Sequence, residues 1–273
     1  MERSLRVGGL NVRYLEHGEG APAILLHGAS LGSSADVWMR NLPTLAAHGL
    51  RVIAPDLPGF GGTDNPEDHS VGYRRRFVPA FMDALDIPRA SLVGHSQSGR
   101  VAVDLAFGEP QRVAKVVVLG TGSLLPPLPG ESSPAADGDD GALSEPTLDE
   151  SRRLLESNLH HRHLATPEAV ALRHRMSLGK NFEAFAARKH TRGAKVEKGG
   201  EAPWQRLARC PVPLLLLYGE DDRGQAARRA ALAKELNPHL DLRLLPRCAH
   251  LVQWDAADAF AELAGRFLSF DYR

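Results

Sequence analysis

Short apolar runs alternate with amphipathic segments along most of the chain. Such runs occur at residues 11–16, 23–26, 51–54, 90–93, 113–119, 213–218 and 242–245. Their length and continuous apolar character are typical of strands buried on both faces. Helical patterns lie between them, for example at residues 77–85 and 101–107. This alternation predicts an α/β fold: a mostly parallel, doubly wound sheet with helices on both faces.

The strand pattern is interrupted between residues 123 and 208. Residues 126–146 are rich in Pro, Gly, Ser and Asp, which is typical of a flexible linker or mobile loop. A helical pattern then runs from Leu148 to about Phe185, and T-P-E at 166–168 has the cap, proline and acid of a helix start. We therefore expect core segments at 1–122 and 209–273. A linker and helical cap at 123–208, inserted between strands 6 and 7, would shield the carboxyl edge of the sheet.

The composition excludes several function classes. Lys and Arg together number 33, as do Asp and Glu, so no excess charge points to nucleic acid or to an anionic membrane. No apolar run approaches the roughly 18 residues of a membrane span, and the N-terminus has no apolar signal core. Cys210 and Cys248 are too few for a disulfide framework, so we interpret them as buried thiols in a reducing compartment, the cytoplasm.

No spacing of Cys and His residues suggests a metal site. The histidines at 160–163 lack a cysteine or carboxylate ligand pattern, and we interpret them as a solvated helix end. We expect neither a metal nor a cofactor.

The sequence G-H-S-Q-S-G at residues 94–99 follows one apolar run and opens a helical segment. Strand, sharp turn and helix are the setting of a nucleophile elbow, which would expose Ser96 at a helix N-terminus. Such a strained turn needs small neighbours, and Ser98 replaces the usual second glycine with another small residue. Taken alone, the segment is also an ordinary Gly/Ser turn, but the flanking strand and helix favour the elbow.

A serine nucleophile needs a base and a group that orients the base. Asp222 follows the run that ends at residue 218, and His250 follows the run that ends at residue 245. Because the carboxyl ends of parallel strands share one edge of a sheet, we expect Ser96, Asp222 and His250 to meet there. Taken singly, Asp222 with its neighbour Asp221 also suits a helix N-cap, and His250 a surface loop. The order Ser, acid, His after three strands favours a triad.

The sequence H-G-A-S at residues 27–30 supplies the second half of an oxyanion hole. Gly28 permits a close approach of the backbone. We assign the two donors to the N–H groups of Ala29 and Gln97. His27 is expected to be structural, hydrogen-bonded beneath the loop.

Arg173 has an unusual position in the expected cap. It shares one helical face with Ala169, Val170 and Met176, which are apolar. One interpretation is a snorkelling side chain paired with a carboxylate of the cap. The other is an anion clamp, because a guanidinium can bind a substrate carboxylate through two parallel hydrogen bonds. The pattern leaves both open.

Four motifs together resemble the α/β-hydrolase superfamily over nearly the whole chain. They are L-H-G at 26–28, P-D-L-P-G-F-G at 55–61, G-H-S at 94–96 and the pair Asp222 and His250. The cap segment with Arg173, and C-A-H-L-V-Q-W-D at 248–255, look like the meta-cleavage-product hydrolases. This resemblance implies cleavage of a carbon–carbon bond in a vinylogous diketone acid from catechol ring fission. It also implies that Arg173 contacts the dienoate end, and it favours Asp222 over Asp221.

Three pocket positions depart from that family. Its glycine-rich oxyanion loop is here A-S-L-G-S-S at 29–34, its asparagine before the nucleophile is His95, and its aromatic residue after the histidine is Leu251. These departures bear on the identity of the substrate more than on the reaction. His95 is either a polar contact, a second proton carrier or a packing residue. Our candidate substrate-binding residues are Ser30, Trp38, His95, Arg173, Leu251 and Trp254.

These observations predict a serine hydrolase that cleaves a carbon–carbon bond in a small substrate, carboxylate-bearing and partly aromatic. The alternatives are an esterase, lactonase or thioesterase with the same triad, a catalytically silent ligand receptor, and a cofactor-independent oxygenase. Expected partners are the small-molecule substrate and a second copy of the chain, as a homodimer or homotetramer, but not nucleic acid or membrane.

Overall fold

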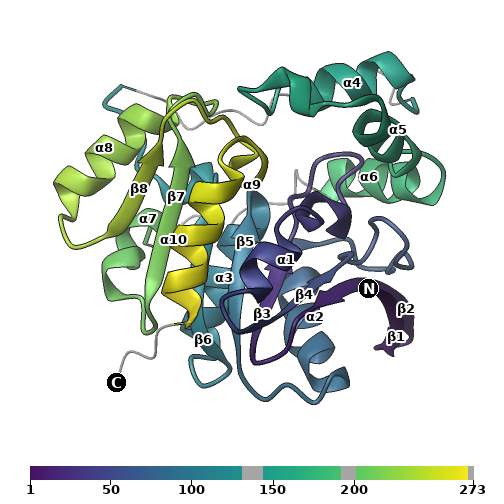
Figure 1. The fold of residues 1–273 in the computed structure, drawn as a ribbon, viewed down its shortest axis with the longest axis horizontal. Coiled ribbons are helices and arrows are strands. Elements are labelled where there is room, and N and C mark those ends of the chain that lie inside the picture. Colours follow the sequence, from purple (N-terminus) through teal and green to yellow (C-terminus); the bar gives the residue numbers. More distant parts are fainter. Residues whose placement is uncertain (131–143, 192–200, 270–273) are drawn as a thin grey trace.

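An eight-stranded sheet forms the centre of the molecule (Figure 1). The computed structural model describes residues 1–130, 144–191 and 201–269. The strand order is β1-β2-β4-β3-β5-β6-β7-β8. The strands are β1 (Glu2–Val7), β2 (Leu10–His17), β3 (Ala21–Leu26), β4 (Leu50–Pro55), β5 (Ala90–His95), β6 (Val113–Leu119), β7 (Leu214–Gly219) and β8 (Asp241–Leu245). Among the described strands, only the pairings β1–β2 and β2–β4 are antiparallel, so the predicted mostly parallel α/β sheet is confirmed.

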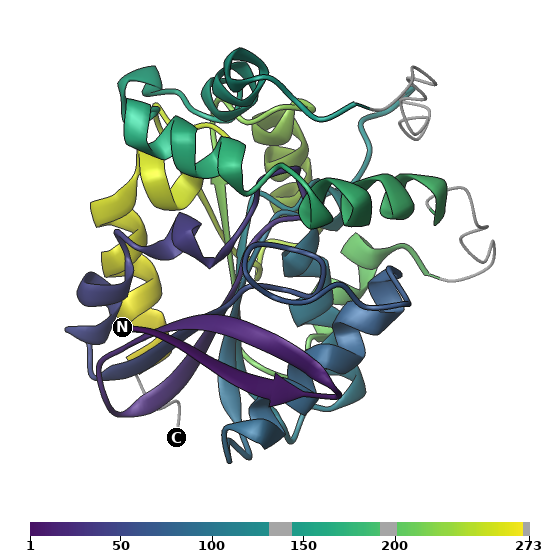
Figure 2. The same cartoon turned by 90° about the vertical axis from the view of Figure 1, so that its right-hand side faces the viewer.

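Helices cover both faces of this sheet, as Figure 2 shows from the side. Helices α1 (Leu42–Ala46) and α10 (Ala257–Ser269) pack on one face. Helices α2 (Val71–Ala84), α3 (Gln97–Gly108) and α8 (Ala226–Leu236) belong to the core on the other. Short helical turns complete the fold: η1 (Ala35–Trp38), η2 (Gly122–Leu124), α7 (Pro203–Arg206), η4 (Leu207–Arg209) and α9 (Val252–Asp255).

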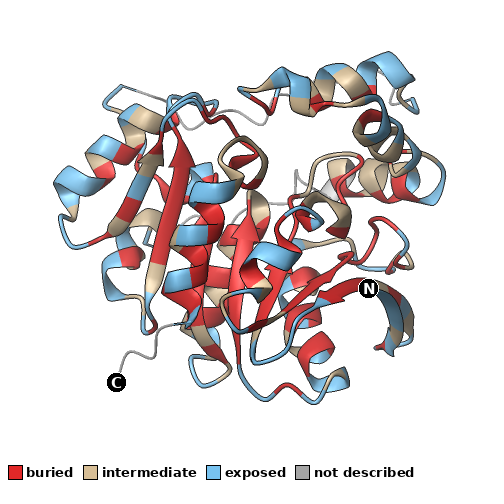
Figure 3. Cartoon of the chain, viewed as in Figure 1, coloured by how far each residue is buried: buried red, intermediate tan, exposed pale blue. Residues whose placement is uncertain are grey.

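The central strands are apolar without alternation because each of their faces packs against a helix layer. Ile24 belongs to the core on one side of the sheet and its neighbour Leu25 to the core on the other, and both are fully buried. Each such side chain contributes about 1.5–3 kcal/mol through burial. Figure 3 shows this buried sheet between exposed helix surfaces.

The longest described helices between β6 and β7 lie where the cap was expected. They are α4 (Leu148–Glu156), α5 (Pro167–Arg175) and α6 (Lys180–Thr191), and they gather at one end of the sheet (Figures 1 and 2). Thr147 and Thr166 cap the first two, each accepting a bond from a backbone N–H of the first turn. Leu155 and Val170 of this cap pack in one cluster with Leu251 of the core. Of the expected linker at 126–146, residues 131–143 lie outside the described residues.

Some elements differ from the sequence pattern. Strand β1 was not expected, because most of its residues are polar and exposed and it pairs only with β2. Helix α2 begins at Val71, well before the expected start at residue 77. Ser70 caps it by accepting a hydrogen bond from the Tyr73 N–H.

Both cysteines are free, but Cys210 is only half-buried. Among the described residues, no helix is long and apolar enough to cross a membrane.

Candidate active site

Ser96 lies at a sharp turn between β5 and α3. Its φ of 57° and ψ of −127° fall in a region that non-glycine residues rarely adopt. Two glycines make the turn feasible. A β-carbon at Gly94 would lie 2.4 Å from a backbone oxygen, and one at Gly99 would lie 2.1 Å from the Thr121 hydroxyl. Ser98, in the usual glycine position, is buried and donates a hydrogen bond to the carbonyl of His27.

Thr121 holds the turn from the neighbouring strand, a role that the sequence pattern did not reveal. Its hydroxyl donates to the carbonyl of Ser96 at 2.6 Å, and its own carbonyl accepts from the hydroxyl of Tyr218 at 2.9 Å. The sequence could have indicated this role, because Thr121 lies just after β6, at the same edge of the sheet as Ser96. The turn is therefore supported by the segment after β6, which is held in turn by β7.

His250 lies beside Asp222 and not beside Asp221. The Nδ1 atom of His250 is 3.0 Å from Oδ1 and 3.2 Å from Oδ2 of Asp222, and both side chains are buried. Gly120 makes room for this pair, since a β-carbon there would lie 3.1 Å from the His250 Nδ1 atom. Asp221 points elsewhere, with its Oδ2 atom 2.6 Å from Nδ1 of His160 in the cap segment.

Two cavities meet at this edge, and Ser30 lines both. The first, the Arg173 cavity, has a volume of about 330 Å³ and includes His95, Arg173 and His250 in its wall. The second, the Ser96 cavity, has a volume of about 350 Å³. Its wall consists of Ala29, Ser30, Leu31, Ser96, Gln97, Leu154, Phe185 and Arg223. A substrate that occupies both cavities would therefore lie against both walls, with His250 in the first and Ser96 in the second.

The candidate oxyanion donors lie together in the Ser96 cavity. Gln97 is the first residue of α3, so its N–H has no acceptor within the helix and carries the positive end of the helix dipole. Ala29 follows Gly28, whose absent β-carbon would lie 3.2 Å from Cβ of Ser96. This close approach brings the loop after β3 over the nucleophile turn.

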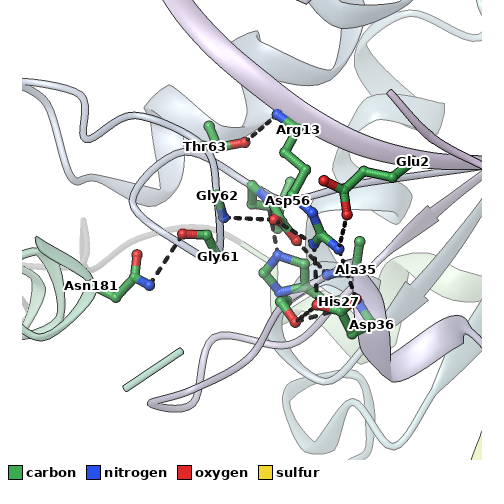
Figure 4. A network of polar contacts seen from close by, with 12 residues as sticks. Glu2, Arg13, His27, Ala35, Asp36, Asp56, Gly61, Gly62, Thr63 and Asn181 are labelled. Carbon is green, nitrogen blue, oxygen red and sulfur yellow. Dashed lines mark hydrogen bonds and ion pairs between the residues drawn. The ribbon is translucent and has the colours of Figure 1, made fainter. Parts of the chain in front are cut away.

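A buried polar network holds this loop from behind (Figure 4). The Asp56 carboxylate is fully buried and accepts hydrogen bonds from the N–H groups of Ala35 and Gly62 and from Arg13 at 2.9 Å. Burial lowers the pKa of Arg13, but the carboxylates of Asp36 and Asp56 outweigh this effect and raise it. The D-L-P-G-F-G motif thus orders the loop without contacting either cavity.

His27 has the structural role expected from the sequence. Its Nε2 atom accepts from the N–H of Leu57 at 3.0 Å, and its Nδ1 atom lies 2.7 Å from the carbonyl oxygen of Gly28. Burial is the main cause that lowers the pKa of His27 to about 4. The imidazole is therefore neutral near pH 7, and because its Nε2 lone pair accepts the Leu57 N–H, it is not available as a catalytic base.

Arg173 lines its cavity without an acidic partner. Its Nη2 atom donates to the Ser30 hydroxyl at 3.1 Å, while Nε is buried with no partner. No carboxylate within the described ranges forms an ion pair with it, so the snorkelling interpretation lacks its expected partner. Burial, with a smaller contribution from Arg223, lowers the pKa of Arg173 to about 10. The guanidinium therefore remains cationic near neutral pH.

The structure separates the other candidate substrate-binding residues into two groups. Ser30, His95, Leu251 and Trp254 line the Arg173 cavity. Trp38 does not, because it is fully buried against Phe260 and lines neither cavity. That assignment failed because an aromatic residue near an active-site loop fits a core position equally well.

The His95 side chain is neutral and is hydrogen-bonded through its Nε2 atom. Its Nε2 atom donates to the carbonyl of His250 at 3.0 Å, and burial, followed by the nearby charge of His250, holds its pKa well below 6.5. Its ring also stacks obliquely against His250, with centroids 4.8 Å apart. It therefore fixes the backbone of the base as well as lining the cavity.

The histidines at 160–163 are largely solvent-exposed, as expected, but they do not end a helix. They precede and enter the short turn η3 (Arg162–Leu164), and the N–H groups of His160 and His161 donate to the carboxylate of Asp255. In the part of the chain that the structure describes, no cluster of three potential metal ligands occurs. These contacts fasten the cap to the core beside Asp222.

Comparisons with known proteins agree with this geometry. The model of the alpha/beta hydrolase family matches residues 23–263. A 2-hydroxymuconate semialdehyde hydrolase from Pseudomonas sp. (strain CF600) is 30% identical, over 98% of this chain and 93% of the relative. A 2-hydroxy-6-oxo-6-phenylhexa-2,4-dienoate hydrolase from Burkholderia cepacia is 31% identical, over 92% and 89%.

Solved structures give the same result. The meta-cleavage product hydrolase CumD from Pseudomonas fluorescens IP01 superimposes with a TM-score of 0.80 and 28% identity, over 97% of this chain and 96% of that chain. Its resemblance therefore includes the cap as well as the sheet. Since the family model spans most of the sequence and the relatives cover nearly all of it, this chain belongs to the α/β-hydrolase family.

Proposed function

We propose that this chain hydrolyses a carbon–carbon bond in a 2-hydroxy-6-oxo dienoate, the kind of acid formed by ring fission of a catechol. The observation that carries the proposal is the half-buried Arg173 side chain, which has no acidic partner and lines the same cavity as His250. A partly desolvated guanidinium without a carboxylate is unfavourable, and a substrate carboxylate would supply the missing partner. The meta-cleavage hydrolases that this chain resembles act on substrates with such a group.

Binding would place the substrate across both cavities. Arg173 holds the C1 carboxylate, which directs the diene along the wall formed by His95, Leu251 and Trp254. The C6 carbonyl then reaches Ser96, with its oxygen facing the N–H groups of Ala29 and Gln97. The group beyond C6 enters the Ser96 cavity.

Cleavage requires C5 to become a leaving carbon. Transfer of the proton of the 2-hydroxyl group to C5 converts the dienol into a 2,6-diketone. The Ser96 hydroxyl then adds to C6, or activates a water that does, while His250 accepts the proton and Asp222 stabilises the imidazolium. The C5–C6 electron pair leaves as a 2-oxo-stabilised carbanion, which takes that proton. Water releases any acyl group left on Ser96.

A substrate panel tests this function directly. Ring-fission dienoates are coloured and bleach on cleavage, so their turnover can be compared with that of p-nitrophenyl esters and lactones. We expect kcat/KM to be highest for a dienoate. Efficient turnover of esters or lactones with no bleaching of any dienoate would overturn the proposal in favour of an ester hydrolase. The cytoplasmic location and the homo-oligomer stay predictions from the sequence.

A further inference from the structure

The carboxylate of Asp255 joins the loop of the catalytic base to the cap. Its Oδ2 atom accepts a hydrogen bond at 2.8 Å from the N–H of Ala249, one residue before His250. The same oxygen accepts from the N–H of His160 at 2.8 Å, and Oδ1 accepts from the N–H of His161 at 2.9 Å. One side chain therefore satisfies three backbone donors that belong to two segments far apart in the sequence.

A direct hydrogen bond on the other side of His250 reinforces this junction. The N–H of Leu251 donates to the carbonyl of Asn158 in the cap at 2.9 Å. Both neighbours of His250 are thus held by the cap segment 158–161, one directly and one through the carboxylate. This segment lies between α4 and α5, the helix that carries Arg173. A shift of the cap would therefore reach the base through these bonds.

Apolar packing alone does not fix the position of the cap over the base. Leu155, Val170 and Leu251 pack in one cluster across the junction, but hydrophobic contacts are not directional. Hydrogen bonds to a carboxylate are short, directional and roughly twice as strong as those between neutral groups. Asp255 is also half-buried, which shields its bonds partly from water. Its three bonds are therefore suited to set the register between the cap and the base.

Resting on the function proposed above, we propose that Asp255 is a positioning residue for the reaction. Arg173 holds one end of the substrate, and Ser96 and His250 act at the other. The reaction thus needs a fixed distance between helix α5 and the base, and Asp255 sets that distance. A displacement of about 1 Å in such an arrangement can lower a rate by about 100-fold.

The test is Asp255→Asn, because an amide has one acceptor oxygen and turns its NH2 group towards at least one of the three donors. With a dienoate, kcat should fall at least about tenfold, as the loss of a hydrogen bond to a charged group allows. KM should change little, since Arg173 still binds the carboxylate. With p-nitrophenyl acetate, which offers Arg173 no carboxylate, kcat should be nearly unchanged. His250 keeps its contacts with Asp222 and His95, so the base remains in place for this small ester.

Asp258→Asn is the matched control. This exposed acid lies three residues further along, at the start of α10, and lines neither cavity. Its substitution removes the same charge and should leave kcat unchanged on both substrates. An equal loss of kcat on the dienoate and the ester in Asp255→Asn would show that Asp255 only stabilises the fold, and would overturn the inference. A change in KM alone would overturn it too.

Hydrogen exchange separates this inference from the proposed reaction. If the natural chain cleaves no dienoate, the proposed function fails, but exchange can still be measured by mass spectrometry in peptides that contain residues 158–161 and 248–251. Asp255→Asn should speed exchange in both segments and Asp258→Asn in neither, which would keep Asp255 as the link between cap and base for a different substrate. Faster exchange in the cap segment alone would overturn the inference.

Discussion

Two residues at the carboxyl edge of the sheet are in states that lower the stability of the folded chain. Ser96 has a φ of 57°, which costs a non-glycine residue on the order of 1 kcal/mol. Arg173 is desolvated, and its Nε atom has no partner. Local rules are broken in this way mainly at functional or strained sites. Both residues are therefore the candidates on which the proposed function rests.

The two adjacent aspartates should behave very differently on substitution. Asp222→Asn should lower kcat by about 10⁴-fold, as expected for the acid of a triad, because the amide no longer orients and stabilises the His250 imidazolium. Ser96→Ala should lose at least as much. Asp221→Asn is the matched control, since its half-exposed carboxylate contacts His160 and not His250. A dead Asp221→Asn with a nearly normal Asp222→Asn would show that the acid was chosen wrongly.

The loop after β3 packs closely against residues 173–177 at the end of helix α5. Gly32 has a φ of +76°, and a β-carbon there would lie 2.4 Å from Oγ of Ser177 and 2.8 Å from Cγ of Arg173. Ser30 in the same loop accepts the hydrogen bond of Arg173. The position of the guanidinium therefore depends on this backbone contact as well as on its own helix.

We expect Gly32→Ala to disturb both stability and substrate binding. Overpacking costs about 1–3 kcal/mol in the free energy of unfolding, and displacement of Arg173 should raise KM for acidic substrates more than it lowers kcat. Gly49→Ala is the control, because Gly49 has nearly the same φ, +77°, with no atom within 4 Å of its missing β-carbon. Urea unfolding and steady-state kinetics measure the two effects. Equal behaviour of both variants would mean that the contact with the cap is unimportant.

Much of the fold was predictable because a buried parallel strand leaves a continuous apolar run in the sequence. The same argument failed for β1, which lies at an edge and carries mostly polar residues. Ser96, Asp222 and His250 could be predicted to meet because three parallel strands end at one edge, and the structure shows the contact of Asp222 with His250. Trp38 and Arg223 could not be assigned in this way. Whether a side chain faces a cavity or the core depends on packing between segments far apart in the chain. A local sequence pattern does not predict such packing.

Two buried neutral histidines make the stability of the molecule depend on pH. His27 has a pKa of about 4 in the folded chain and about 6.5 when unfolded, and His95 is shifted in the same direction. The unfolded chain therefore binds more protons below pH 6.5, so each histidine stabilises the fold fully above that pH. Its contribution falls by about 1.4 kcal/mol per pH unit towards pH 4.

Urea unfolding at pH 7 and pH 5 should show a loss of about 2 kcal/mol that comes from His27. In His27→Gln the loss should be smaller by this amount, because this group no longer titrates, whatever the variant's stability at pH 7. An identical loss in His27→Gln would contradict this assignment.

Recognition of a substrate carboxylate by Arg173 is the claim on which the proposed function depends most. It is tested by kcat/KM for a dienoate and for its C1 methyl ester, in the natural chain and in Arg173→Ala and Arg173→Lys. We predict that Arg173→Ala loses about 30-fold to several-thousand-fold on the acid, equivalent to roughly 2–5 kcal/mol, and much less on the ester. Arg173→Lys should recover little of this loss, because an ammonium cannot form the paired hydrogen bonds. An equal loss on acid and ester would contradict the account.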